Sequence, residues 1–167
     1  MKKYSCLLYG LLFFAFVSCK KEDFHVEEIS SNSINNSLLG NWYLEDVPFD
    51  TLKLKRGYTF KQDNGFEYLE MVINSSGDVL GFRHRLLGKY EVKGDKLTMF
   101  YSHHYIYDFN KGEYEDIENL KPAGEANLPK TVTSDFSQDK NTLTLYFPPC
   151  GPNEFCTDVN FMTYYKE

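Results

Sequence analysis

Histidines are the first residues whose chemistry has to be considered, because His84, His103 and His104 lie within one short region of the chain. A metal site needs its ligands at about 2 Å from a single ion. In the hairpin register predicted below, His84 lies level with Met99 and roughly 16 Å from His103. The adjacent His103 and His104 point to opposite faces of a strand. The sequence therefore predicts no metal site and no other cofactor.

Nucleophiles and acids show no catalytic spacing. No serine lies in a Gly-x-Ser-x-Gly elbow, and the sequence has no glycine-rich phosphate cradle. Carboxylates are plentiful, but the strand pattern places most of them on outward faces or in an acidic stretch over residues 108–130. We therefore predict no catalytic residue and a protein that is not an enzyme.

Two cysteines, Cys150 and Cys156, bracket the stretch CGPNEFC near the end of the chain. A five-residue spacer is too long for a Cys-x-x-Cys redox pair, and no histidine or further cysteine lies nearby in the sequence. In an oxidising compartment a disulfide closing this loop contributes about 2 kcal/mol on the loop-entropy model. We predict a structural Cys150–Cys156 disulfide, with a zinc site as the alternative.

Residues 1–18 are typical of a bacterial export signal. Two lysines precede an apolar run over residues 6–17, which is shorter than the about 20 residues that a membrane-spanning helix needs. Residues 16–19, FVSC, resemble a bacterial lipobox, in which the cysteine receives a diacylglycerol and becomes the first mature residue. We predict Cys19 as the lipid attachment site, with a secreted protein without lipid as the alternative.

Residues 19–37 start with the lipidated Cys19 and continue as a polar stretch rich in Ser, Asn and Glu, which is typical of a flexible tether. The charged residues directly after Cys19 are similar to the signal that sends some Gram-negative lipoproteins to the outer face of the outer membrane. We therefore expect a protein held at that membrane by its N-terminal lipid. A net charge of −6 is a poor match for nucleic acid, which is not an expected partner.

From residue 38 onward, apolar residues alternate with a period of two, as in half-buried strands. In TLKLKRGYTF, for example, Leu52, Leu54, Tyr58 and Phe60 share one face. Neither a long helix nor an internal repeat is evident. Eight or nine short strands must close or stack to remove their edges. We therefore predict one all-β domain over residues 38–167, an eight- to nine-stranded antiparallel up-and-down barrel.

Three hairpin turns are predicted, each of which keeps apolar residues on one face of the sheet. The opposed pairs that they imply are Tyr90 with Met99 across a type II′ turn at Gly94-Asp95, His84 with Tyr90 across a loop over residues 86–88, and Phe136 with Leu143 across a loop over residues 138–141.

Residues 108–130 interrupt the alternation with an acidic stretch that contains two prolines. Tyr114, Ile117 and Lys121 would share one face of a helical turn or two that ends before Pro122. Loops of this length in compact domains are usually functional lids or disordered segments. We predict a mobile flap, with disorder as the alternative.

A series of short motifs follows in a fixed order from residue 38. These are Gly40-Asn41-Trp42, Tyr58-Thr59-Phe60 with Asp63-Asn64-Gly65-Phe66, Gly88-Lys89-Tyr90 with Gly94-Asp95-Lys96-Leu97, and Asn141-Thr142-Leu143-Thr144-Leu145. Their order resembles the lipocalin-like lipoproteins of Gram-negative bacteria, which have a calycin-type barrel, over most of residues 38–167. The resemblance implies a cup whose open end admits a small apolar ligand, and a structural Trp42 under the closed end. The mid-chain Thr-Asp-Tyr of true lipocalins is missing, and Lys166 stands where an arginine is expected near the last strand.

Aromatic residues make up 17% of the chain, so the inside of such a cup is rich in rings. Small eight-stranded barrels are either filled by side chains or hold one small ligand. The predicted lining residues of a ligand pocket are Tyr58, Phe60, Phe82, Tyr90, Met99, Tyr101 and Leu145. We expect the barrel to bind a small hydrophobic molecule without transforming it. The alternative is a filled barrel whose exposed loops bind another envelope protein.

Overall fold

The computed structural model describes residues 36–49, 51–124, 129–149 and 160–167, with only the backbone of residues 45–47 and 49. The predicted signal, Cys19 and the Cys150–Cys156 bridge lie outside the described residues. The elements in chain order are β1 (Gly40–Phe49), β2 (Leu52–Phe60), β3 (Gly65–Ile73), β4 (Val79–Lys93), β5 (Lys96–Ile106), the 3₁₀ turn η1 (Ile117–Asn119), β6 (Lys121–Pro122), β7 (Lys130–Phe136), β8 (Thr142–Tyr146) and β9 (Phe161–Lys166). In this part of the chain no helix is long and apolar enough to cross a membrane.

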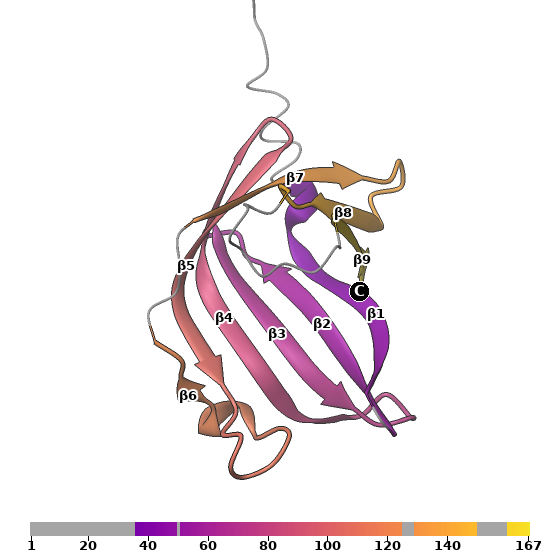
Figure 1. Cartoon of the computed structure of the whole chain (residues 1–167). Coiled ribbons are helices and arrows are strands. Elements are labelled where there is room, and N and C mark those ends of the chain that lie inside the picture. The colour runs from indigo at the N-terminus through magenta and orange to yellow at the C-terminus, as the bar shows by residue number, and fades with distance from the viewer. Residues whose placement is uncertain (1–35, 50, 125–128, 150–159) are drawn as a thin grey trace, which may run out of the picture.

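The strands form one antiparallel sheet in the order β4-β3-β2-β1-β9-β8-β7-β5-β6, and a further pairing of β4 with β5 closes it (Figure 1). Eight strands therefore complete a barrel, and the two-residue β6 is added at the edge of β5. If β6 is left aside, strands that are adjacent in the sheet follow one another in the chain. The exception is the pair of β1 and β9, the first and last strands. The predicted all-β, antiparallel up-and-down barrel of eight to nine strands is confirmed.

Differences in strand length divide the barrel into two parts. The strands β1–β5 have nine to fifteen residues, whereas β7, β8 and β9 have five to seven. Strand β7 pairs with β5 only from Lys96 to Met99, and β9 pairs with β1 only at Trp42 and Tyr43. We call the part where β7–β9 complete the circle the closed half. The part of β1–β5 that continues past it in Figure 1 is the extended half.

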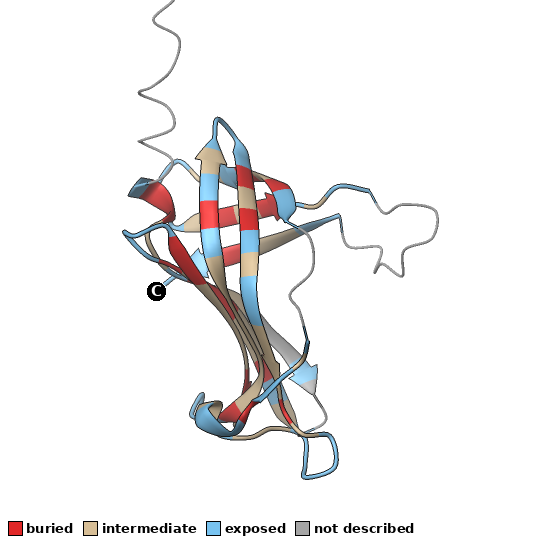
Figure 2. Ribbon diagram, turned by 90° about the vertical axis from the view of Figure 1, so that its left-hand side faces the viewer, coloured by how far each residue is buried: buried red, intermediate tan, exposed pale blue. Residues whose placement is uncertain are grey.

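The main core fills the closed half. Each of the eight barrel strands contributes a buried side chain to it, as the red segments in the upper part of Figure 2 show. Its members are Leu38, Trp42, Tyr58, Phe60, Phe66, Tyr90, Leu97, Met99, Val132, Leu143, Leu145 and Tyr164. Aromatic rings contact one another in edge-on and stacked geometries, with centroids 5.1 Å apart for Phe60 and Tyr90 and 5.6 Å apart for Tyr58 and Phe60. The described members of this core therefore lie between residues 38 and 164.

Trp42 is fully buried in this core. Its indole Nε1–H donates a hydrogen bond of 2.6 Å to the carbonyl oxygen of Leu38, and its ring meets Phe136 edge-on at 5.8 Å. The ammonium group of Lys166 lies over the indole ring, 5.1 Å from its centroid. Lysine thus covers the tryptophan by a cation–π contact at the position where the resemblance leads one to expect arginine.

Two of the three predicted hairpins are confirmed in register. Tyr90 pairs with Met99, and Phe136 pairs with Leu143. Gly94 has a φ of 60°, whereas Asp95 is not among the residues with positive φ. A positive φ at the first turn position alone is the mark of the predicted type II′ turn.

The loop predicted over residues 86–88 is wrong, because β4 runs unbroken through these residues. Gly88 was interpreted as a turn residue, but it lies inside the strand where β5 carries a bulge. A Cβ at Gly88 would lie 2.2 Å from the carbonyl oxygen of Phe100. The glycine therefore permits a close approach of two strands instead of a change of direction.

The acidic segment follows a defined path along β4 and β5 up to residue 124. Glu115 exchanges both backbone hydrogen bonds with Phe82 of β4, at 2.8 and 3.1 Å. The side chain of Lys121 binds Asp108 at 2.6 Å, and Leu120 is buried. The single turn η1 corresponds to the short helical segment expected before Pro122. This part of the predicted flap is thus docked on the barrel.

Candidate functional site

Three charged residues of the extended half meet on the inner face of the sheet. Arg56 of β2 pairs with Glu70 of β3 across the strands. Because side chains alternate along a strand, Arg56 shares the inner face with Tyr58 of the core. Arg83 occupies the bulge of β4 between the residues that pair with Glu70 and Met71. We call Arg56, Glu70 and Arg83 the inner charged cluster.

Glu70 lies between the two guanidinium groups of this cluster. Its carboxylate oxygens are 3.9 Å from Arg56 Nε and 3.8 Å from Arg83 Nε. Both distances exceed the about 2.7–3.2 Å of a direct hydrogen bond. Arg83 also donates from Nη2 to the hydroxyl of Tyr107 at 3.0 Å. The Nε atom of Arg56 is buried and has no hydrogen-bond partner among the described groups.

Four tyrosines, two in the apolar core and two packed against it, lie next to the inner charged cluster. The ring of Tyr58 is 5.0 Å from that of Tyr68 and 5.5 Å from that of Tyr164, between centroids. Burial raises the pKa of Tyr58, Tyr68 and Tyr164, and the negative charge of Glu70 raises that of Tyr68 further. The hydroxyls of Tyr58 and Tyr101 are joined by a hydrogen bond. These phenols are therefore protonated at neutral pH and can act as hydrogen-bond donors.

Two histidines belong to the same inner face. His84 pairs with Glu70 and with Ile106. The predicted pairing with Tyr90 is wrong, because β4 has no turn between these two residues. The rings of His84 and His104 are 5.6 Å apart between centroids. Burial lowers the pKa of His104, and the neighbouring His84 lowers it further. Across the described ranges, no three His, Cys, Asp or Glu side chains are grouped closely enough to hold a metal ion.

The predicted pocket-lining residues do not all lie together. Five of them, Tyr58, Phe60, Tyr90, Met99 and Leu145, are packed inside the core of the closed half. Tyr101 packs against that core from its edge, toward the extended half. Phe82 lies apart from them near the far end of β4, where it pairs with Met71 and bonds to Glu115.

Sequence reasoning missed Arg56 and Glu70, although a signal for both was present. In TLKLKRGYTF the inner positions are every second residue back from Phe60, so Arg56 occupies the same face as Leu54 and Tyr58. Glu70 holds the equivalent position in β3. A charge on the apolar face of an alternating strand marks a buried polar site, because such a charge requires a partner.

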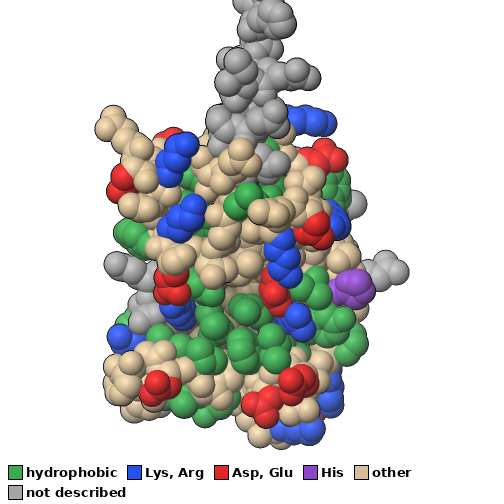
Figure 3. Space-filling view, turned by 180° about the vertical axis from the view of Figure 1, so that it is seen from behind, with side chains coloured by type: hydrophobic (Ala, Val, Ile, Leu, Met, Phe, Trp, Pro, Cys, Tyr) green, Lys and Arg blue, Asp and Glu red, His purple; other side chains and the backbone are tan. Residues whose placement is uncertain are grey.

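On the outer face of the barrel, acidic and basic side chains form ion pairs with each other. Arg85 Nε lies 2.7 Å from Glu67, and Lys89 lies 3.0 Å from Asp63. Seen from behind, the surface shows acidic and basic side chains dispersed among hydrophobic ones (Figure 3). No large area of one charge is visible on this face.

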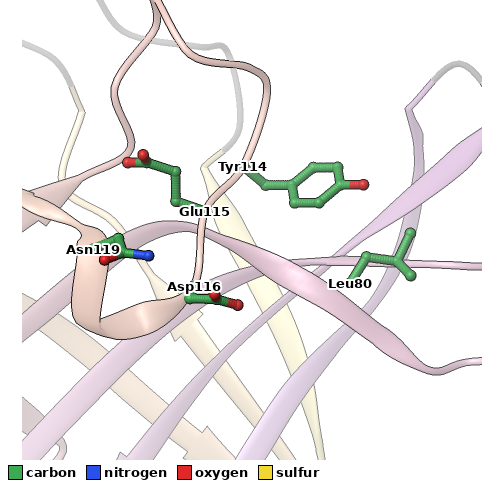
Figure 4. Close-up of a pocket in the computed structure, with 5 residues that line it drawn as sticks. All are labelled: Leu80, Tyr114, Glu115, Asp116 and Asn119. Atoms are coloured by element: carbon green, nitrogen blue, oxygen red, sulfur yellow. The ribbon is translucent and has the colours of Figure 1, made fainter.

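An open pocket of about 280 Å³ lies where the acidic segment meets β4. It is lined by Leu80, Tyr114, Glu115, Asp116 and Asn119. In Figure 4 the ring of Tyr114 extends on the side of Leu80, whereas the Glu115 side chain points the other way. The Glu115 carboxylate already accepts a hydrogen bond of 3.0 Å from the backbone N–H of Asp108. The other polar groups of its lining belong to Tyr114, Asp116 and Asn119.

The inner charged cluster and its tyrosines place charged and polar groups on the inner face of the barrel, where a hydrophobic core would suffice for folding. We therefore take them as the candidate functional site. Its groups are charged or hydrogen-bond donors, and they adjoin an aromatic core. A scan against protein-family models finds no match to this chain, and a search of curated proteins finds none either.

Proposed function

We propose that this is a lipid-anchored, non-catalytic protein of the outer membrane whose barrel binds a small, largely apolar molecule. The observation that carries the proposal is the inner face of the barrel beyond its filled core. Leu54 and Val72 are buried on that face, but several other apolar and aromatic side chains there are only half-buried. These are Leu44, Tyr68, Leu86, Tyr101, Ile106 and Met162.

The binding place is the inner face of the extended half. The closed half is occupied by the packed rings of Trp42, Phe66, Tyr90 and Tyr164, each of which is almost fully buried. Binding there would require the core to repack, whereas the half-buried face can cover a ligand as it stands. A few polar groups beside an apolar wall are the usual composition of a small-molecule site.

Anchoring rests on residues 16–19 and is tested at Cys19. We expect a Cys19→Ala variant of the full chain to lose acylation, because the sulfur that accepts the diacylglycerol is gone. Mass spectrometry of the protein extracted from membranes measures this directly. A Cys19→Ala protein that still carried acyl mass would overturn the anchoring.

Ligand binding is tested with residues 20–167, which include every described member of the core. We would record a native mass spectrum of this protein and compare it with the denatured mass. Extra mass in the native spectrum alone supports a bound molecule and begins to identify it. Bare protein mass that persists after incubation with lipid extract of the host would contradict the proposal.

The alternative function, binding of another envelope protein, is favoured by one feature of the outer surface. Tyr146 and Phe161 are exposed on β8 and β9 with ring centroids 6.1 Å apart, and Tyr165 is exposed on the same strand. Exposed aromatic groups of this kind are common at protein interfaces. Cross-linking on intact cells that gives a discrete adduct, lost in a Phe161→Ser variant, would favour this reading over the ligand.

A further inference from the structure

We propose a second binding site, for a small organic cation, in the open pocket where the acidic segment meets β4. The pocket is formed at the beginning of β4, and none of its lining residues belongs to the inner charged cluster. The proposal is therefore independent of the molecule that the barrel binds. Its ligand class is an amine that is protonated at neutral pH and carries a short apolar part.

The first step is the wall of the pocket, which contacts between the acidic segment and β4 hold in place. Glu115 exchanges both backbone hydrogen bonds with Phe82, at 2.8 and 3.1 Å. The ring of Tyr114 lies against Gly81, where an added Cβ would be 2.5 Å from the Cδ2 atom of the ring. Leu80 is exposed and Tyr114 is half-buried. The pocket thus has an aromatic and an aliphatic surface that are already in position and that a ligand can reach.

The second step is the polar groups of the lining. Three of them have no hydrogen-bond or ion-pair partner among the described residues, namely the hydroxyl of Tyr114, the carboxylate of Asp116 and the side-chain amide of Asn119. In Figure 4 the side-chain ends of Asp116 and Asn119 point to the side on which Leu80 and Tyr114 lie. A carboxylate and an amide thus face the same space as the aromatic ring.

The third step is charge, which favours a cation. Residues 108–121 contain five acidic side chains and two lysines. Both lysines are paired, Lys111 with Glu115 at 3.8 Å and Lys121 with Asp108 at 2.6 Å. The three other acids of this stretch form no ion pair with a described residue. An anion would therefore be repelled from the pocket, whereas a cation would be attracted.

The fourth step is the choice of an organic cation over a metal ion. In the described part of the chain no three His, Cys, Asp or Glu side chains are grouped closely enough to hold a metal. An ammonium group needs acceptors for its N–H groups and gains from an aromatic ring within about 6 Å. Asp116 and Asn119 provide the acceptors, and Tyr114 provides the ring. At about 280 Å³ the pocket has room for roughly nine water molecules of about 30 Å³ each, so the ligand has about ten non-hydrogen atoms or fewer.

The test compares two probes that differ only in the head group. Isotope-labelled protein of residues 20–167 is titrated with 2-phenylethylammonium and with 2-phenylethanol at neutral pH and physiological ionic strength, and nuclear magnetic resonance follows the backbone amide signals. We expect the ammonium to bind with a dissociation constant on the order of 1 mM, about fivefold more tightly than the alcohol, as for a partly exposed ion pair and cation–π contact. Its largest shift changes should fall on residues 79–82 and 112–120.

Three outcomes would overturn this inference, and each of them would leave the proposed function of the barrel standing. The first is no binding of the ammonium up to about 10 mM. The second is a set of shift changes confined to other parts of the protein. The third is equal affinity for the ammonium and the alcohol, which would remove the preference for a cation.

An Asp116→Asn variant identifies the charge that is responsible. It should weaken binding of the ammonium about threefold to fivefold and leave the affinity for 2-phenylethanol unchanged. The matched control is Glu118→Gln, which removes the same charge from an exposed residue of η1 that does not line the pocket. Asp116 is exposed and its side chain makes no cap hydrogen bond to η1, so the fold should be unchanged in both variants. Unchanged binding in Asp116→Asn, or an equal loss in Glu118→Gln, would show attraction by the acidic segment as a whole and would contradict a site in the pocket.

Discussion

The closed half and the extended half are formed by the same long strands, yet their inner faces are different. In the closed half the inner positions are large apolar or aromatic side chains that are almost fully buried, such as Phe66 and Met99. One or two rows further along, the same strands place Arg56 and Glu70 on that face. A strand can therefore change from a core-forming to a site-forming element without any change of its alternation.

The difference indicates that the two halves contribute differently to folding and to the proposed binding of a ligand. The closed half is completed by β7–β9 and contains the main hydrophobic core. The extended half has buried and half-buried apolar side chains, and the buried Nε of Arg56 there has no hydrogen-bond partner among the described groups. Half-buried side chains and buried charged groups of this kind contribute little to folding and are typical of sites that meet a ligand. Substitutions in the two halves should consequently have different effects.

The largest effect is expected for Trp42→Ala in the closed half. The substitution removes a fully buried indole, its hydrogen bond to Leu38 and the contact with Lys166. We expect the free energy of unfolding to fall by about 3–5 kcal/mol. Urea unfolding followed by far-ultraviolet circular dichroism measures it, since Trp42 is the only tryptophan and cannot serve as the probe.

The comparison for Trp42 is Ile106→Ala in the extended half. Ile106 is half-buried and lies on the inner face opposite His84. Truncation of Ile106 should lower the free energy of unfolding by only about 1 kcal/mol, because a half-buried side chain contributes less buried apolar surface. Equal losses in the two variants would mean that the extended half is as tightly packed as the closed half.

The second-largest loss of stability is expected for Gly88→Ala in β4, next to the bulge of β5. A Cβ there would lie 2.2 Å from the Phe100 carbonyl oxygen and 2.6 Å from the ring of Phe66. Because a backbone atom is involved, the strands must move apart, and we expect a loss of about 1–3 kcal/mol. Gly112→Ala is the matched control, since its nearest atom would be 3.9 Å away and stability should not change. Urea midpoints of the two variants decide this.

The position of Gly88 also shows how far sequence reasoning reached. Alternation and turn residues were sufficient to predict the class of fold and the registers around Gly94 and Phe136, because those turns are local. The glycine at residue 88 was interpreted as a turn by the same logic. Its actual role depends on the bulge in β5 and on the ring of Phe66, which are contacts distant in the sequence.

The candidate site was less predictable than the fold for a related reason. The aromatic positions Tyr58 and Tyr101 were expected on the inner face, and both lie there. Whether an inner position belongs to a filled core or to a half-buried face depends on the lengths of β7–β9, and periodicity does not contain those lengths. The pairing of Arg56 with Glu70 could be seen only once the register of β2 with β3 was known.

The third prediction concerns Tyr68 at alkaline pH. Its pKa is raised above the ordinary value of 10.0, mainly by burial and further by Glu70. The unfolded chain ionises first, so the contribution of Tyr68 is fully present below pH 10.0 and is lost as the pH rises toward the folded pKa. Above pH 10.0 the stability of the protein should fall, and in Tyr68→Phe this fall should be shallower by up to about 1.4 kcal/mol per pH unit.

Urea unfolding at several pH values between 8 and 12 measures this slope. Tyr165→Phe is the control, because Tyr165 is exposed on β9 and meets water in both states. A Tyr68→Phe slope identical to that of the unmodified protein would show that the tyrosines beside the inner charged cluster are well hydrated. The contrast between the two halves would then be weaker than the structure indicates.

The smallest effect is expected at His104, and it separates burial from charge within the extended half. The pKa of His104 is lowered from 6.5, first by burial and second by His84. As the pH falls below 6.5 the unfolded chain therefore binds the proton first, and stability decreases down to the folded pKa. A nuclear magnetic resonance titration of the imidazole signal, assigned with a His104→Gln variant, measures that pKa. In His84→Asn it should rise and still remain below 6.5, because the larger cause, burial, is unchanged. A complete return to 6.5 would mean that the inner face at His104 is exposed to water and that charge alone distinguishes it from the closed half.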